Sequence, residues 1–150
     1  MIDLRQPIHV VYGGAHLFQA GTIPKLGLLA VRNMMENAED CFAFAEGVGL
    51  PEAALAPASR NARVSLLRRF VKMGEKARAV HPAAWLVYAV HQRVLEKLRR
   101  QPVEDYRIDF EDGYGFRSDE DEDRQALQAA EETCSAIAAK SLPPFFGIRI

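Results

Sequence analysis

Apolar and charged side chains alternate along residues 106–111, which read Tyr-Arg-Ile-Asp-Phe-Glu. Because successive side chains of a β-strand point to opposite faces, Ile108 and Phe110 share one face. The other face carries three charged residues: Arg107, Asp109 and Glu111. The pattern predicts a strand near 106–111, with an apolar face that packs on a core and a charged face that needs polar partners.

Two further stretches have the composition of short strands. A strand near 8–12 is predicted from Val-Val-Tyr, which favours extended chain and is apolar on both faces, as in a buried parallel strand. The pair Gly13-Gly14 ends it, and a simple turn is favoured because no phosphate-loop spacing follows. A third strand is predicted near 146–150, after Pro143-Pro144 turns the chain.

Apolar residues recur at helical spacing between these strands. One helix is predicted after Thr22, from Leu26, Leu29, Ala30 and Met34. A second is predicted over 60–79 and a third from Pro82. A fourth begins after Ser118, a good N-cap, and its first turn is acidic, which suits the helix dipole.

The order strand, helices, strand, helix, strand predicts an α/β fold with parallel strands and right-handed crossovers. The first crossover spans about 90 residues, so we expect an insertion of extra helices at about 50–100. The chain stops within the third strand, which would leave a bare sheet edge. We therefore expect residues 1–150 to be a single incomplete domain, the N-terminal part of a longer protein.

The composition is that of an ordinary globular protein, with 150 residues and a formal net charge of −1. Cys41 and Cys134 match no metal or redox spacing, so we interpret them as ordinary thiols. No apolar run approaches the roughly 18 residues of a membrane span, and the start is not a signal peptide. A cytoplasmic location without membrane contact is the expectation.

The most specific candidate chemistry lies at the end of the second strand. Asp109, Glu111 and Asp112 are followed by Gly113 and Gly115, which permit a sharp turn. Carboxylates at the carboxyl end of a strand, before a flexible loop, are typical of active sites in α/β proteins. The alternative, an exposed edge strand with a solvated acidic turn, stays open at this point.

The segment from Arg60 to Arg100 contains eleven Lys and Arg residues and only two acidic residues. Such a run is usually the solvated face of helices, and an anion-binding surface is the alternative. A binding module should gather five cations on one continuous face: Arg60, Arg63, Arg68, Arg69 and Lys72. Nucleic-acid binding is not expected, because no aromatic or groove-reading element accompanies the run.

The sequence also resembles a known family. Asp109-Phe110-Glu111-Asp112-Gly113 resembles the Asp-Leu-Glu-Asp-Ala stretch of the HpcH/HpaI aldolase and citrate lyase β-subunit superfamily. The acidic segment 119–124, the strand 147–150 and the first strand with its turn at 10–18 are similar to segments of the same enzymes. Asp-Phe-Glu-Asp-Gly-Tyr-Gly is similar to the motif of a branch of large aldolase-like proteins.

This resemblance implies part of a TIM (β/α)8 barrel of the phosphoenolpyruvate/pyruvate type. It also implies a magnesium-dependent carbon–carbon lyase, an aldolase acting through an enolate on a 2-oxo or hydroxy acid, or on an acyl-CoA thioester. Glu111 and Asp112 would be catalytic, and Arg149 and Asp109 would bind substrate. The direct metal ligands would come from later strands, beyond Ile150. Gly113-Tyr114-Gly115 departs from the Ala-Val of citrate lyase relatives, so use of CoA is not carried over.

Strand geometry agrees with these roles. Arg149 lies on the opposite side from Phe146 and Ile148, so it should face Asp109 and Glu111 if the second and third strands are neighbours. A guanidinium can bind a carboxylate with two hydrogen bonds. The pair could be a structural ion pair or a substrate-binding arginine, and an inactive fragment or a small anion-binding module are the alternative functions. A homo-oligomer is left open.

Overall fold

The computed structural model describes residues 5–150. They form two compact units. Unit 1 comprises the N-terminal residues to Ala30 together with Leu98–Ile150, and unit 2 comprises Val31–Lys97. Whether 1–150 is a single incomplete barrel domain stays a prediction.

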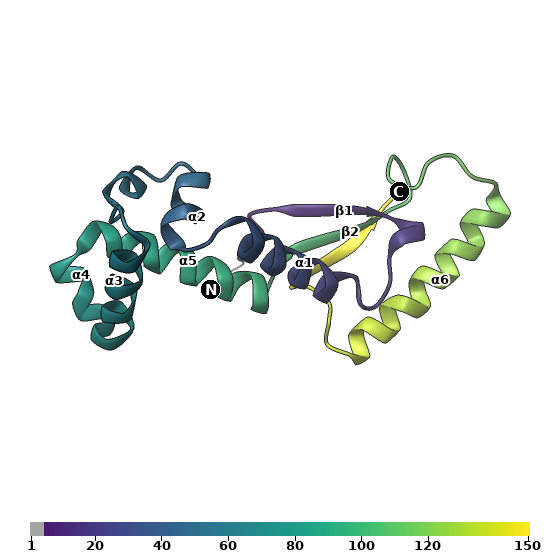
Figure 1. Ribbon diagram of the computed structural model, residues 1–150. Helices are drawn as coiled ribbons and strands as arrows, with labels where there is room; N and C mark the ends of the chain where they lie inside the picture. The colour runs from purple at the N-terminus through teal and green to yellow at the C-terminus, as the bar shows by residue number, and fades with distance from the viewer. Residues whose placement is uncertain (1–4) are drawn as a thin grey trace. The chain divides into compact units, whose positions relative to one another are not determined.

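Unit 1 contains a parallel three-stranded sheet with the order β1-β2-β3. The strands are β1 (Val10–Gly14), β2 (Asp105–Asp109) and β3 (Phe145–Arg149). The predicted α/β fold with parallel neighbouring strands is therefore confirmed (Figure 1). Three strands form an open sheet, so the barrel remains a prediction.

The second strand is displaced by one to two residues from its predicted bounds, because it begins at Asp105 and ends at Asp109. The Asp109 carboxylate accepts hydrogen bonds from the N–H groups of Glu111 and Gly113. These bonds turn the chain, so Glu111 lies in a loop and not on the strand.

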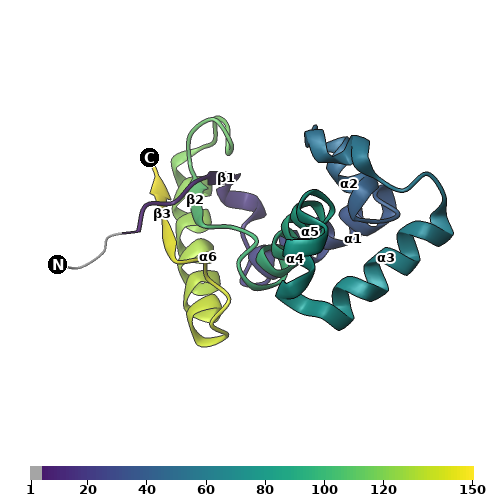
Figure 2. The same cartoon turned by 90° about the vertical axis from the view of Figure 1, so that its left-hand side faces the viewer.

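One face of the sheet is the apolar core of unit 1. Tyr106 and Ile108 of β2 are buried there with Phe18. The Phe18 ring lies 5.6 Å from that of Tyr106 and 5.5 Å from that of Phe146. Helix α1 (Thr22–Asn37) contributes Ile23 to this cluster, and α6 (Asp119–Ala138) contributes Ala129. Figure 2 shows α6 running along the sheet.

The other face of the sheet is polar. The register aligns Gly14, Asp109 and Arg149 across the three strands. Two residues earlier, and so on the same face, it aligns Tyr12 with Arg107. Asp109 is 2 % exposed, whereas Tyr12 is 55 % exposed. The face is therefore polar and open at β1, and it carries the candidate residues.

Helices fill the connection from β1 to β2. In chain order they are η1 (Ala15–Leu17), α1, α2 (Cys41–Gly47), η2 (Pro51–Leu55), α3 (Arg60–Met73), η3 (Gly74–Lys76), α4 (Ala77–Val80) and α5 (Pro82–Arg100). The helix predicted over 60–79 is interrupted at Gly74, whose φ of 56° ends α3. No helix of the described residues is long and apolar enough to cross a membrane.

Unit 2 has a core of its own, made of Cys41, Phe42, Ala45 and Val87. Asp40 caps α2 by accepting hydrogen bonds from the N–H groups of Phe42 and Ala43. Cys41 packs in this core, and burial raises the pKa of its thiol to about 12.

Candidate functional site

The loop after β2 is organised by the buried carboxylate of Asp109. Its Oδ1 accepts from the Glu111 N–H at 2.9 Å, and its Oδ2 accepts from the Gly113 N–H at 3.1 Å. The N–H groups of Tyr114 and Gly115 then both donate to the Glu111 carbonyl. The loop is therefore a turn held by its own hydrogen bonds, in which Gly115 adopts a φ of 75°.

Arg149, at the end of β3, lies among three carboxylates from the end of β2 and the loop that follows it. Its Nε is 2.5 Å from Glu111, its Nη2 is 2.9 Å from Asp112 and its Nη1 is 3.4 Å from Asp109. The predicted approach of Arg149 to Asp109 and Glu111 is confirmed, and Asp112 joins them. The hydrogen bond that Arg149 donates to Asp112 is the main reason that the pKa of Arg149 is raised above its usual range.

The three carboxylates hold Arg149 with different rigidity. The side chain of Asp109 is 3 % exposed and fixed by backbone N–H groups, whereas those of Glu111 and Asp112 are 45 % and 86 % exposed. Arg149 itself is 37 % exposed and its guanidinium lies 5.5 Å from the Tyr12 ring. An incoming anion can therefore replace Asp112 on Arg149 while Asp109 keeps the guanidinium oriented.

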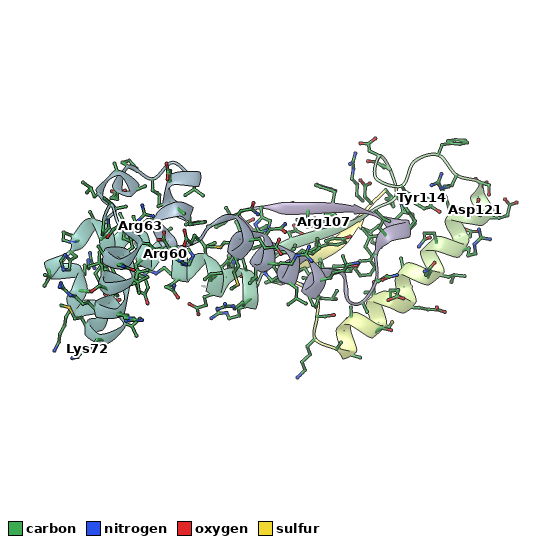
Figure 3. The ribbon with its side chains drawn as sticks, viewed as in Figure 1. Arg60, Arg63, Lys72, Arg107, Tyr114 and Asp121 are labelled. Carbon is green, nitrogen blue, oxygen red and sulfur yellow. The ribbon has the colours of Figure 1, made fainter. Side chains whose placement is uncertain are left out.

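A second ion pair lies on the same face, one step earlier along the strands. Arg107 donates to Asp105 at 2.8 Å, which raises the pKa of Arg107 (Figure 3). Asp105 Oδ1 is buried and has no hydrogen-bond partner among the described residues. The guanidinium of Arg107 occupies the space beside Gly147 where a side chain would otherwise stand. The sequence reasoning did not select this pair, although Asp-x-Arg-x-Asp alternation signals it.

The end of β1 packs tightly against the loop after β2 that carries Glu111 and Asp112, which we call the acidic loop. A Cβ on Gly14 would lie 2.0 Å from the carbonyl oxygen of Gly113, and 2.8 Å from the imidazole of His16. The His16 ring is also 5.7 Å from that of Tyr114. An imidazole therefore lies at the carboxyl end of the sheet. Sequence reasoning missed it, and its position two residues after Gly13-Gly14 was the available signal.

Tyr114 ties the acidic loop to α6. It is 5 % exposed, and its hydroxyl donates to the Asp121 carbonyl at 3.2 Å (Figure 3). Arg117 lies 5.3 Å from the same ring. The loop is thus anchored to the first turn of α6 by the tyrosine of the Gly-Tyr-Gly sequence.

The acidic loop is not a metal centre by itself. Among the described residues no group of three His, Cys, Asp or Glu side chains is arranged to hold a metal ion. Both oxygens of Asp109 are already used by backbone N–H groups, and Glu111 and Asp112 pair with Arg149. These residues do not fit a magnesium ion unaided, and the magnesium expectation is untested.

The five cations expected to form one anion-binding face differ in their contacts. Arg60 pairs with Glu39, and Arg63 pairs with Asp40 and donates to the Pro57 carbonyl. The other three lie further along α3, around a hollow of about 500 Å³: Arg68, Arg69 and Lys72. Figure 3 shows Arg60 and Arg63 toward the start of α3 and Lys72 toward its end.

A protein-family model described as "Domain of unknown function (DUF6986)" matches residues 2–150. No curated protein and no solved structure matches the chain.

Proposed function

We propose that this chain, which belongs to the DUF6986 family, binds a 2-oxo or hydroxy acid through Arg149 as part of an aldolase-type carbon–carbon lyase. One observation carries the proposal. A guanidinium is held by Asp109 at the carboxyl end of adjacent parallel strands, and its other two partners are exposed carboxylates of a loop. This sheet edge is where α/β enzymes bind ligands.

The sheet supports the barrel expected from the resemblance. Its strands are parallel, adjacent in chain order and covered by α1 and α6 on the apolar face. In a (β/α)8 barrel each strand likewise pairs with the next, helices cover the outside and active sites use the carboxyl ends of the strands. We infer that the polar face with Tyr12, Arg107 and Arg149 is the interior side of such a barrel.

The residues suit cleavage through an enolate. Arg149 binds the substrate carboxylate or carbonyl oxygen, and Asp109 orients Arg149. Glu111 or Asp112 accepts the proton of the substrate hydroxyl. As the deprotonated oxygen forms a carbonyl and that fragment leaves, the electron pair of the breaking carbon–carbon bond forms an enolate, whose oxygen Arg149 stabilises. Return of the proton to the enolate carbon then gives the 2-oxo acid product. The resemblance implies magnesium for this chemistry.

The test is a binding and turnover comparison. Calorimetric titration with pyruvate and oxalate should detect binding, and hydroxy acids should release pyruvate or glyoxylate in assays run with and without magnesium and CoA. Arg149→Lys keeps the charge but loses the planar fork, so turnover should fall about a hundredfold. Arg124→Lys, on an exposed arginine of α6, is the matched control and should change nothing. Equal turnover of both variants would contradict the proposal.

A second candidate is an anion-binding module, favoured by Arg68, Arg69 and Lys72, which have no carboxylate partner among the described residues. Titration with pyrophosphate separates the two candidates. If Arg68→Gln abolishes pyrophosphate binding and Arg149→Lys leaves it unchanged, the anion-binding module is favoured.

A further inference from the structure

In unit 2, one side of α5 borders a groove of about 710 Å³. Its apolar lining recurs at helical spacing, through Trp85, Leu86, Ala89 and Val90. Leu86 is 44 % exposed, although Trp85 also packs on the buried Phe70 ring at 5.6 Å. The groove therefore has a firm aromatic wall and an uncovered apolar floor.

Two arginines line the same groove. Arg78 of α4 precedes the apolar residues in the chain, and Arg93 follows them on α5. Neither has a carboxylate partner among the described residues, although Glu75 also lines the groove. An apolar floor with unpaired cations fits a partner that is apolar and acidic.

In unit 1, α6 presents a surface of that kind. Its inner face buries Ala129 and Ala136. Its outer side exposes apolar residues at intervals of three and four, with Leu127 69 % and Ile137 60 % exposed: Leu127, Ala130, Cys134 and Ile137. Exposed acids stand along the same side, at Asp123 and Glu131. We call this surface the α6 stripe.

We propose that the α6 stripe of one copy of this chain docks in the α5 groove of a second copy. The lengths are compatible, because the groove runs along α5 from Pro82 to Arg93 and the stripe along α6 from Asp123 to Ile137, roughly 16 and 21 Å of helix. Leu127 and Cys134 face the apolar floor, and the acids of the stripe pair with Arg78 and Arg93.

The opposite net charges of the two units also favour a second copy of this chain as the partner. Unit 2 has ten Lys and Arg residues against seven Asp and Glu residues, whereas unit 1 has nine against thirteen. Attraction between the acidic unit of one copy and the basic unit of another favours association over like-charge contacts. Because each copy carries both surfaces, association between copies needs no second protein.

The first experiment measures association by sedimentation and light scattering between about 1 and 100 μM protein. The wild type should form dimers that weaken at high salt. Arg93→Glu should raise the dissociation constant at least tenfold, and adding Asp123→Lys to it should restore association. Arg68→Glu, the same charge change on α3, should leave association unchanged. A wild type that stays monomeric, or equal effects of the two single variants, would overturn the proposal.

The second experiment uses the exposed Cys134, since Cys41 is buried. In Ala89→Cys, mild oxidation should give a disulfide between the groove of one copy and Cys134 of another, visible as a dimer on a non-reducing gel. The dimer should disappear when Cys134→Ser is added. Ser65→Cys, on the exposed side of α3, is the control. Equal cross-linking in both cysteine variants, or a monomer whose groove instead binds an added acidic peptide, would contradict docking by a second copy.

Discussion

At the scale of single residues, one buried carboxylate organises the candidate site. Asp109 closes the turn after β2 through two backbone N–H groups and also holds Arg149 at 3.4 Å. A buried charge is stable only with such partners. The site therefore depends on backbone placement, and the close contact of Gly14 with Gly113 is part of that placement.

Gly14→Ala should destabilise unit 1 and displace the acidic loop. The new methyl group would lie 2.0 Å from the Gly113 carbonyl, which is backbone and cannot rotate away. We expect a loss of about 1–3 kcal/mol in the free energy of unfolding, as for other overpacked sites, measured by urea denaturation. Gly21→Ala is the control, because nothing lies within 4 Å of that position. A neutral Gly14→Ala would show that the loop moves freely.

At the scale of elements, α6 owes its start to local sequence. The Ser118 hydroxyl accepts from the Asp121 N–H, and four acids occupy the first turn. Both features stabilise a helix N-terminus. Tyr114 joins this turn to the acidic loop, so the stability of the α6 start bears directly on the candidate site.

Ser118→Ala should cost about 1 kcal/mol of stability, the usual effect of removing an N-cap. Ser135→Ala, within the same helix, should be neutral or slightly stabilising, because the Ser135 hydroxyl only bonds back to the Glu131 carbonyl. Urea unfolding of the two variants, followed by circular dichroism, measures the difference. If Ser118→Ala were no less stable than Ser135→Ala, the cap would have no energetic role.

At the scale of the whole molecule, stability is divided between two cores. Ile108 is buried in the cluster of unit 1, whereas Phe70 is buried in unit 2 and packs on His81, Trp85 and Tyr88. Each unit has its own cluster of buried apolar residues, so local opening should be distinct in the two.

Core truncations should reveal this division by hydrogen exchange. Ile108→Ala should cost about 2–5 kcal/mol and Phe70→Ala about 3–5 kcal/mol. Protection should fall mainly in unit 1 for the first variant and mainly in unit 2 for the second. Equal loss of protection throughout the chain in both variants would show instead that the two cores unfold as one cooperative unit.

Local pattern alone located the three strands and the longest helices of this protein, although the helix predicted over 60–79 is interrupted at Gly74. Alternation at 106–111 identified the central strand, and Ser118 with the following acids located the start of α6. Since apolar faces must be buried, the order of strands and helices also implied a parallel sheet. The pairing of Arg149 with Asp109 followed from strand periodicity, whereas Glu111 contacts Arg149 from the loop after β2.

Only the tertiary structure decided which groups actually meet. The contact of Gly14 with Gly113 and the placement of His16 beside Tyr114 depend on the approach of segments about 100 residues apart. Folding also decides which basic residues form ion pairs. Arg63, for example, pairs with Asp40, a residue 23 positions earlier in unit 2. Side-chain periodicity specifies the face on which a residue lies, whereas backbone hydrogen bonds and close packing determine its neighbours.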